Sequence, residues 1–104
     1  MNSYELIKAI QEKINSPRRW CRKANARDHY GEPTSPTEPG AVSFCILGAA
    51  WAIVPDEPTR YGLLGPLEFY LGGDIAKAND KDNVNWQSIQ IALDFAALAI
   101  KEEA

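Results

Sequence analysis

Hydrophobic residues group along this chain into segments with helical spacing, and one segment is apolar on every side. Residues 41–53 carry no charge, whereas a surface helix of this length would show a polar face. The run is also shorter than the roughly 20 apolar residues that span a bilayer. Gly48 destabilises a helix interior, so its presence there favours close approach of another backbone. We therefore predict a central helix at about residues 41–53.

Two amphipathic segments predict helices near the ends of the chain. The first should follow Ser3 as its N-cap, because apolar residues then recur with i, i+3, i+4 spacing. The last should follow Asn85 and run from about Trp86 to Glu102, with Phe95 and Leu98 widening its buried stripe. The buried stripes are then Leu6, Ile7, Ile10 and Ile14 in the first helix, and Ile89, Leu93, Ala96, Ala97 and Ile100 in the last.

The middle of the chain predicts shorter elements. Residues 17–26 are predicted to form a short basic helix, because Pro17 is suited to the first turn of a helix. Residues 27–40 contain three prolines and two glycines, which predicts a loop. Glycines and a proline should divide residues 59–71 into two helical pieces, and Asp74 should cap the single turn 75–78.

The predicted fold class is all-α, with four or five helices packed around the central apolar helix of residues 41–53. No segment alternates apolar and polar residues as a half-buried strand does, and no repeat occurs. With 104 residues, the chain should form one domain over residues 1–104. An apolar fraction of 45% and a charged fraction of 24% are typical of globular proteins. Without a signal-peptide pattern or a membrane segment, we expect a cytoplasmic protein that does not bind membranes.

Charge is distributed unevenly and marks the strongest functional candidate. Residues 1–27 hold seven basic and two acidic residues, a net charge of +5, while the remainder holds four basic and twelve acidic residues, a net charge of −8. On the predicted helix the basic residues would form two adjacent columns that could bind phosphates of a nucleic acid or an acidic partner. Pairing with acidic residues of the same domain, such as Asp28, Glu32, Glu57 or Glu68, is the structural alternative. The candidate binding residues here are Arg18, Arg19, Arg22, Lys23 and Arg27.

Several short motifs together resemble a known family. Trp20-Cys21 is followed by a proline-rich loop, then by Cys45-Ile46-Leu47-Gly48-Ala49, then by Asn79-Asp80 and a capped C-terminal helix. This order resembles a family of small bacterial and phage proteins known as a domain of unknown function, with Trp-Cys, Cys-x-x-Gly-Ala and Asn-Asp motifs. Phe44 and Ala78 stand where that pattern usually has tryptophan. The resemblance implies a fold and no activity.

The remaining chemistry-bearing residues do not form a recognised catalytic pattern. Cys21 and Cys45 could serve a thiol enzyme or a metal site with His29 and Asp28, but free cysteines are most often buried core residues. Phosphate-loop, nucleophile-elbow and zinc-protease motifs do not occur, so we predict no catalytic residue, cofactor or metal.

Three further residues are binding candidates. Asn79 and Asp80 could hold a ligand or partner, or could form a local turn in which Asn79 adopts a left-handed conformation. Trp86 would be a contact residue if its ring were exposed.

Two functions of different kinds follow from the sequence, and a third is weaker. The first is a non-enzymatic helical module that binds a protein partner or itself, which requires an exposed apolar patch. The second is a small protein that binds nucleic acid or phosphate through residues 18–27. The third, a Cys/His enzyme, requires Cys21, Cys45 and His29 to lie together.

Overall fold

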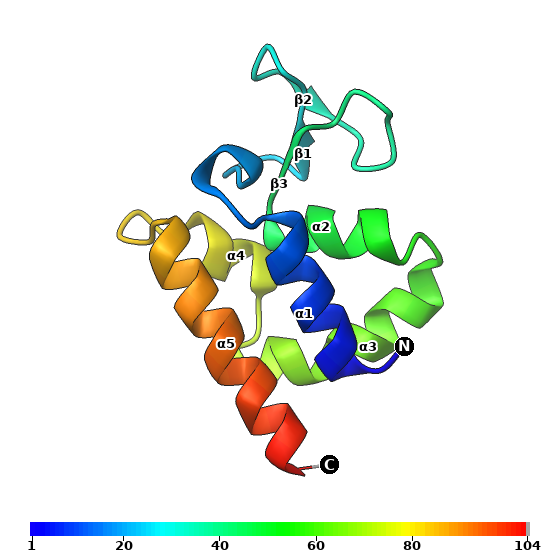
Figure 1. Ribbon diagram of the computed structural model, residues 1–104, viewed down its shortest axis with the longest axis vertical. Helices are drawn as coiled ribbons and strands as arrows, with labels where there is room; N and C mark the ends of the chain where they lie inside the picture. The colour runs from blue at the N-terminus through cyan, green and yellow to red at the C-terminus, as the bar shows by residue number, and fades with distance from the viewer. Residues whose placement is uncertain (104) are drawn as a thin grey trace.

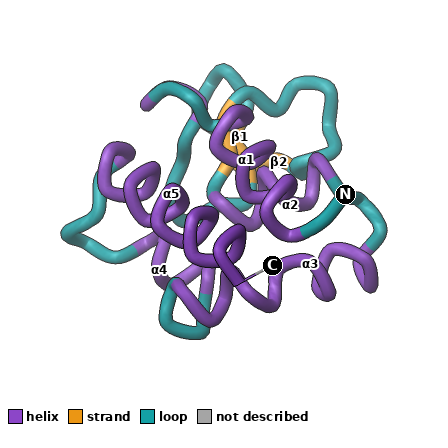
Figure 2. Tube along the Cα trace, turned by 60° about the horizontal axis from the view of Figure 1, so that its bottom comes forward, coloured by secondary structure: helices purple, strands orange, loops and turns teal. Residues whose placement is uncertain are grey.

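The computed structural model describes residues 1–103, the side chain of Glu103 excepted, and shows a helical body with a small sheet at one end (Figures 1 and 2). Five α-helices, a short 3₁₀ helix and three two-residue strands follow one another along the described chain. Their order is α1 (Ser3–Lys13), η1 (Pro17–Arg19), β1 (Ala26–Arg27), β2 (Pro33–Thr34), β3 (Ser43–Phe44), α2 (Ile46–Ile53), α3 (Glu57–Tyr70), α4 (Ile75–Asp80) and α5 (Trp86–Glu103).

Helix α1 contributes more of the large, fully buried side chains than any other described helix, and it packs against α2, α3 and α5. The predicted stripe is confirmed, because Leu6, Ile7, Ile10 and Ile14 are all completely or almost completely buried. The helix begins one residue earlier than expected. Asn2 is the N-cap, and its side chain and that of Glu5 form a reciprocal capping box.

Helix α2 is shorter than the predicted central helix because the chain enters it from a strand. Residues 43–44 form β3, and Cys45 caps the helix, which therefore starts at Ile46. Its inner face is buried at Ile46, Ala49 and Ala50, whereas Trp51 remains partly exposed. The boundary at residue 41 was therefore wrong, and the helix lies beside α1 with one side incompletely covered.

The three strands form an antiparallel sheet in the order β2-β1-β3. Ala26 pairs with Thr34 on one side and with Phe44 on the other. The prediction of a purely α-helical fold was therefore wrong, although the fold is mainly helical. Strands of two residues are too short for an alternating pattern, and two of them adjoin or interrupt the predicted loop of residues 27–40.

Residues 17–26 do not form the predicted basic helix. After the single 3₁₀ turn η1, Trp20 pairs with Phe44 and the Cys21 N–H donates to the Phe44 carbonyl at 3.1 Å. Lys23 adopts a left-handed conformation with φ of 61°, which no helical residue has. The prediction of two columns of basic side chains was therefore wrong, because this segment runs alongside β3 and does not form a helix.

Helix α3 is continuous through residues 57–70, where two pieces were predicted. Pro66 lies inside it, and Leu64 and Leu67 on its inner face are buried. The helix ends in a Schellman motif, in which the Gly73 N–H donates to the Glu68 carbonyl at 2.7 Å and Gly72 has a φ of 90°.

The last two helices largely match the prediction. Asp74 caps α4, which continues beyond the expected turn to Asp80, and the Asn85 side chain accepts from the Ser88 N–H at the start of α5. Asn79 is consequently helical, and the left-handed conformation considered for it was wrong.

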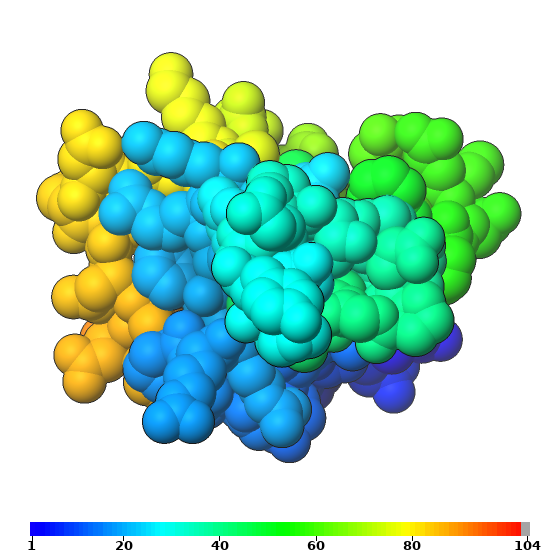
Figure 3. Space-filling view, turned by 90° about the horizontal axis from the view of Figure 1, so that it is seen from above, coloured from blue at the N-terminus to red at the C-terminus, as the bar shows by residue number. Residues whose placement is uncertain are grey.

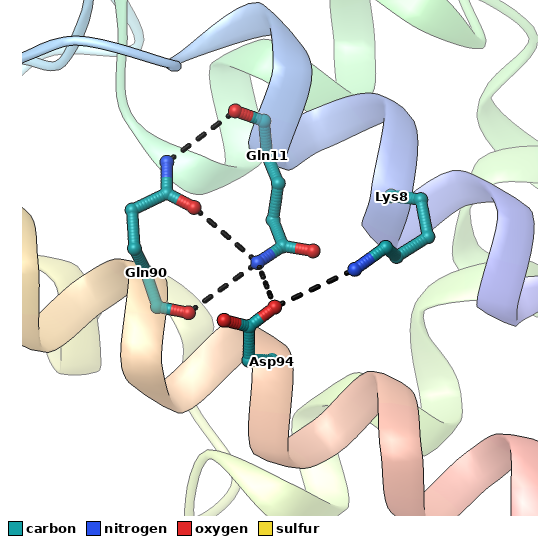
Figure 4. Close-up of polar contacts among 4 residues, drawn as sticks. All are labelled: Lys8, Gln11, Gln90 and Asp94. Carbon is teal, nitrogen blue, oxygen red and sulfur yellow. Dashed lines mark hydrogen bonds and ion pairs between the residues drawn. The ribbon is translucent and has the colours of Figure 1, made fainter.

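Polar side chains fix the orientation of α5 on α1 (Figure 4). The Gln11 Nε2 donates to Asp94 Oδ1 at 2.7 Å, and the Gln90 Nε2 donates to the Ile14 carbonyl at 2.9 Å. Lys8 and Asp94 form the one ion pair found within the described part of the chain, at 3.4 Å. Among the described helices, none combines the length and apolarity required to cross a bilayer.

Candidate functional site

The buried side chain of Asn79 joins three segments that are distant in sequence. Its Oδ1 accepts from the Trp20 Nε1 at 2.8 Å and from the Ile46 N–H at 3.1 Å. Its Nδ2 donates to the Cys21 carbonyl at 3.1 Å and to Asp80 Oδ1 at 2.9 Å. The amide of Asn79 has no exposed surface, so it holds the protein together and does not present a polar group to a partner.

The neighbouring Asp80 continues this network. Its Oδ1 also accepts from the Lys23 N–H at 2.9 Å, and its backbone carbonyl accepts from the Arg22 guanidinium at 2.7 Å. The same guanidinium donates to the carbonyl of Lys81. These bonds hold Lys23 in its left-handed conformation. Two of the predicted binding residues are thus tied to the end of α4, Arg22 by its side chain and Lys23 by its backbone.

Cys45 and Gly48 close the network on the side of α2. The Cys45 Sγ accepts from the Gly48 N–H at 3.2 Å, which is how this residue caps the helix. Gly48 lies so close to the carbonyl of Asn25 that a Cβ there would be 1.7 Å from the oxygen. The Asn25 carbonyl also accepts from the Cys45 N–H at 3.2 Å.

The motif residues noted in the sequence therefore meet at one place. Trp-Cys, Cys-x-x-Gly-Ala and Asn-Asp supply the contacts that join the segment 20–25, the start of α2 and the end of α4. These contacts explain the residue types by packing and hydrogen bonding, and they require no reaction.

The two thiols are poor nucleophiles in this environment. Burial raises the pKa of Cys45 from an ordinary value of 9.0 to about 11, and burial also raises the pKa of Cys21. His29, the only histidine of the chain, is exposed in the loop, and its ring lies tilted against that of Tyr30 with ring centres 3.9 Å apart. Among the side chains that the structure describes, no three His, Cys, Asp or Glu residues are grouped to hold a metal ion.

The basic residues are not paired with the acidic residues of the domain. Within the described chain, none of the five predicted basic side chains makes an ion pair with a carboxylate. Arg27 donates to the carbonyls of Gly31 and Arg22 at 2.9 and 3.0 Å. Arg18 and Arg19 are exposed. No carboxylate therefore neutralises these basic side chains through an ion pair.

Trp86 lies beside Trp20, Arg22 and Arg27 in the wall of a surface pocket of about 680 Å³. The ring is partly buried, and its Nε1 donates to the Ile14 carbonyl at 2.7 Å. The pocket lies where residues 17–27 meet the start of α5, and Figure 3 shows the blue and the orange segments in contact on this face. Three of the predicted binding residues thus come together, whereas Arg18 and Arg19 lie outside the pocket wall.

A second candidate surface is apolar and lies on the outer side of α5. It was not predicted from the sequence. Ile91, Phe95 and Leu98 are 69%, 65% and 57% exposed, although Phe95 and Leu98 were expected to widen the buried stripe. The ring of Phe95 lies 6.4 Å from that of Tyr70, which contacts Phe69 at 5.1 Å. We call Phe69, Ile91, Phe95 and Leu98 the α5 apolar face. Residues 91, 95 and 98 have the i, i+4, i+7 spacing of one helix face, and this spacing is the sequence signal that could have revealed the surface.

Comparison with known proteins found no match: no family model, no curated protein and no solved structure is similar to this chain. The bacterial and phage family therefore stays a resemblance, and function has to be argued from the geometry of these surfaces.

Proposed function

We propose that this protein is a non-enzymatic helical interaction module that pairs with a second copy of itself through the α5 apolar face. The observation that supports this proposal is the exposure of four large apolar side chains on adjoining parts of α3 and α5. Contiguous apolar patches of this kind usually mark contact surfaces. The buried thiols and the dispersed acidic and histidine residues give no comparable support to an enzyme.

The spacing on α5 favours a second copy as the partner. At about 1.5 Å of rise per residue, Ile91 and Leu98 lie roughly 6 Å and 4.5 Å on either side of Phe95. An antiparallel pair with its two-fold axis at Phe95 would place the two phenyl rings together and each Ile91 near the other copy's Leu98. Such self-complementarity is what an isologous dimer interface requires.

The size of the face is also suitable. Covering an aromatic side chain buries about 150–250 Å², so the four side chains contribute a few hundred Å² on each copy. A standard interface buries about 800 Å² per partner, and the surrounding residues of α5 and α3 can supply the rest. The expected dimer is therefore of moderate strength.

Replacing Phe95 by glutamate should abolish dimer formation, because the two-fold axis would place two carboxylates together. Sedimentation velocity from low to high micromolar concentration measures this change. Tyr30→Glu is the matched control, since Tyr30 is also an exposed aromatic residue, 79% against 65% for Phe95, and lies in the loop between β1 and β2. The wild type and Tyr30→Glu should dimerise to the same extent. A wild type that stays monomeric at all concentrations would overturn the proposal.

A further inference from the structure

The pocket beside Trp86 has walls of unusual composition. Its lining combines two indole rings, two guanidinium groups and two side-chain amides, and contains no carboxylate. The lining residues are Pro17, Trp20, Cys21, Arg22, Arg27, Asn85, Trp86 and Gln87. Four other surface pockets each include an aspartate or a glutamate in their walls. This pocket therefore offers positive charge that no acid in its wall offsets.

The two tryptophans are held in fixed positions. The Trp20 N–H is bonded to Asn79 and the Trp86 N–H to the Ile14 carbonyl, so neither indole needs a hydrogen-bond partner from a ligand. What the rings offer to the pocket is flat apolar surface. Such surfaces bind the planar rings of nucleobases by stacking.

The side chains of both arginines are held by backbone carbonyls and not by carboxylates. Arg22 donates to the carbonyls of Asp80 and Lys81, and Arg27 donates to those of Gly31 and Arg22. Carbonyls orient a guanidinium without neutralising it, and each guanidinium keeps N–H groups that make no hydrogen bond within the described part of the chain. The Nε of Arg22 is buried without a partner, and a buried donor of this kind costs stability unless something binds it.

The acidic residues nearby are occupied elsewhere. The carboxylate of Asp28 accepts from the N–H groups of Tyr30 and Glu32 in the β1–β2 turn. Asp80 directs its Oδ1 to Lys23 and Asn79 and lines a different pocket. Neither of these carboxylates lies in the pocket wall.

From this arrangement we infer that the pocket binds a nucleotide, with the base against the indole rings and the phosphate against Arg22 and Arg27. A volume of about 680 Å³ is within the usual range for a small-molecule site. Gln87 is exposed, and Asn85 uses its Oδ1 to cap α5, so amide N–H groups remain for the edge of a base. The nucleotide is either a free mononucleotide or one unit of a single-stranded nucleic acid, which offers the same chemistry.

Titration with adenosine monophosphate, followed by proton–nitrogen NMR of the indole N–H groups, tests this inference. The chain has three tryptophans, and Trp51 lines a different pocket, so its signal is an internal reference. The signals of Trp20 and Trp86 should shift and that of Trp51 should not. Adenosine and inorganic phosphate alone should each bind at least about tenfold more weakly, because each uses half of the site. A short single-stranded oligonucleotide, added separately, distinguishes the two sources of the ligand.

Gln87→Glu places a negative charge in the pocket wall without removing any hydrogen bond described above. It should weaken nucleotide binding about fivefold, as expected for one like charge in a solvated site. Asn83→Asp makes the same chemical change at an exposed position outside the wall and should alter binding less than twofold. Binding of the oligonucleotide but not of the mononucleotide, weakened in Gln87→Glu, would support the inference with a nucleic acid as the source. No shift with either ligand, equal binding by both variants, or a binding of phosphate equal to that of the nucleotide would overturn it.

Discussion

Gly48 shows how one missing side chain permits the contact between two segments. A Cβ at this position would lie 1.7 Å from the carbonyl oxygen of Asn25 and 2.6 Å from its carbon. That carbonyl also accepts from the Cys45 N–H, so it cannot move away without losing a bond at the start of α2. The sequence indicated a close backbone approach at Gly48, and the structure confirms it and identifies the backbone as that of Asn25.

Gly48→Ala should therefore destabilise the protein by at least about 3 kcal/mol, since a methyl group against backbone atoms forces the helix and the segment apart. Gly62→Ala is the matched control. Gly62 is also inside a helix, but no atom lies within 4 Å of a Cβ there, so alanine should stabilise the protein by about 0.5–1 kcal/mol. Urea unfolding followed by circular dichroism measures both changes. Equal effects of the two substitutions would contradict the close contact.

At the scale of elements, Asn79 determines how the segment 20–25, α2 and α4 are joined. Its one amide satisfies the indole N–H of Trp20, the first N–H of α2 and the carbonyl of Cys21. Helix α4 has only six residues, and isolated helices of that length are not stable. This amide and the packing of Ile75 therefore hold α4 in place.

Asn79→Ala should lower the free energy of unfolding by on the order of 3 kcal/mol or more, because three buried groups lose their partner. The signal of the Trp20 indole N–H should move as its acceptor disappears. Asn83→Ala removes an amide from an exposed position of the α4–α5 connection and should change stability by less than about 0.5 kcal/mol. If Asn79→Ala were as mild as Asn83→Ala, the role assigned to this amide would be wrong.

The sequence predicted an element well where the residues that determine it lie within the element itself, and poorly where they lie far away in the chain. Helices α1, α4 and α5 have caps and apolar spacing in their own residues, and they were located to within a few positions. Residues 17–26 instead pair with β3 and bond to Asp80, and these contacts join residues at least 18 positions apart, which leaves no periodic signal. Helix α3 continues through Pro66 because Leu64 and Leu67 pack into the core, and this outweighs the lost hydrogen bond.

The candidate sites divide in the same way. The basic residues and Trp86 were found as residue types, but the pocket was not, because Trp20 and Trp86 are adjacent only once α5 lies on α1. The outward turn of Phe95 and Leu98 also depends on tertiary structure. Gln90 and Asp94 face α1 and so fix which side of α5 is exposed.

For the whole molecule, the buried thiol of Cys45 predicts how stability depends on pH. Its pKa is about 11 in the folded protein and near 9.0 when exposed, so between these values the unfolded chain binds fewer protons. The free energy of unfolding should therefore be unaffected by this group below pH 9 and should fall as the pH rises from about 9 to about 11.

Cys45→Ser tests this dependence, because serine keeps an N-cap acceptor and does not titrate in this range. The stability of the wild type relative to the variant should decrease by about 2–3 kcal/mol between pH 9 and pH 11. Chemical unfolding at a series of pH values measures the difference. If the free energies of unfolding of the two proteins had the same dependence on pH, the thiol would ionise with the same pKa in the folded and unfolded states, and the prediction would be wrong.

The packing of α5 on α1 also determines when folding can be completed during synthesis. About 70 residues separate the end of α1 from the start of α5, and ribosomes add roughly 5–20 residues per second. For several seconds α1 is outside the ribosome without α5, one of the three helices that pack against it. The nascent chain therefore passes through a period in which the side of α1 that packs on α5 is open to chaperones or to other nascent chains, and this period ends when α5 has left the ribosome.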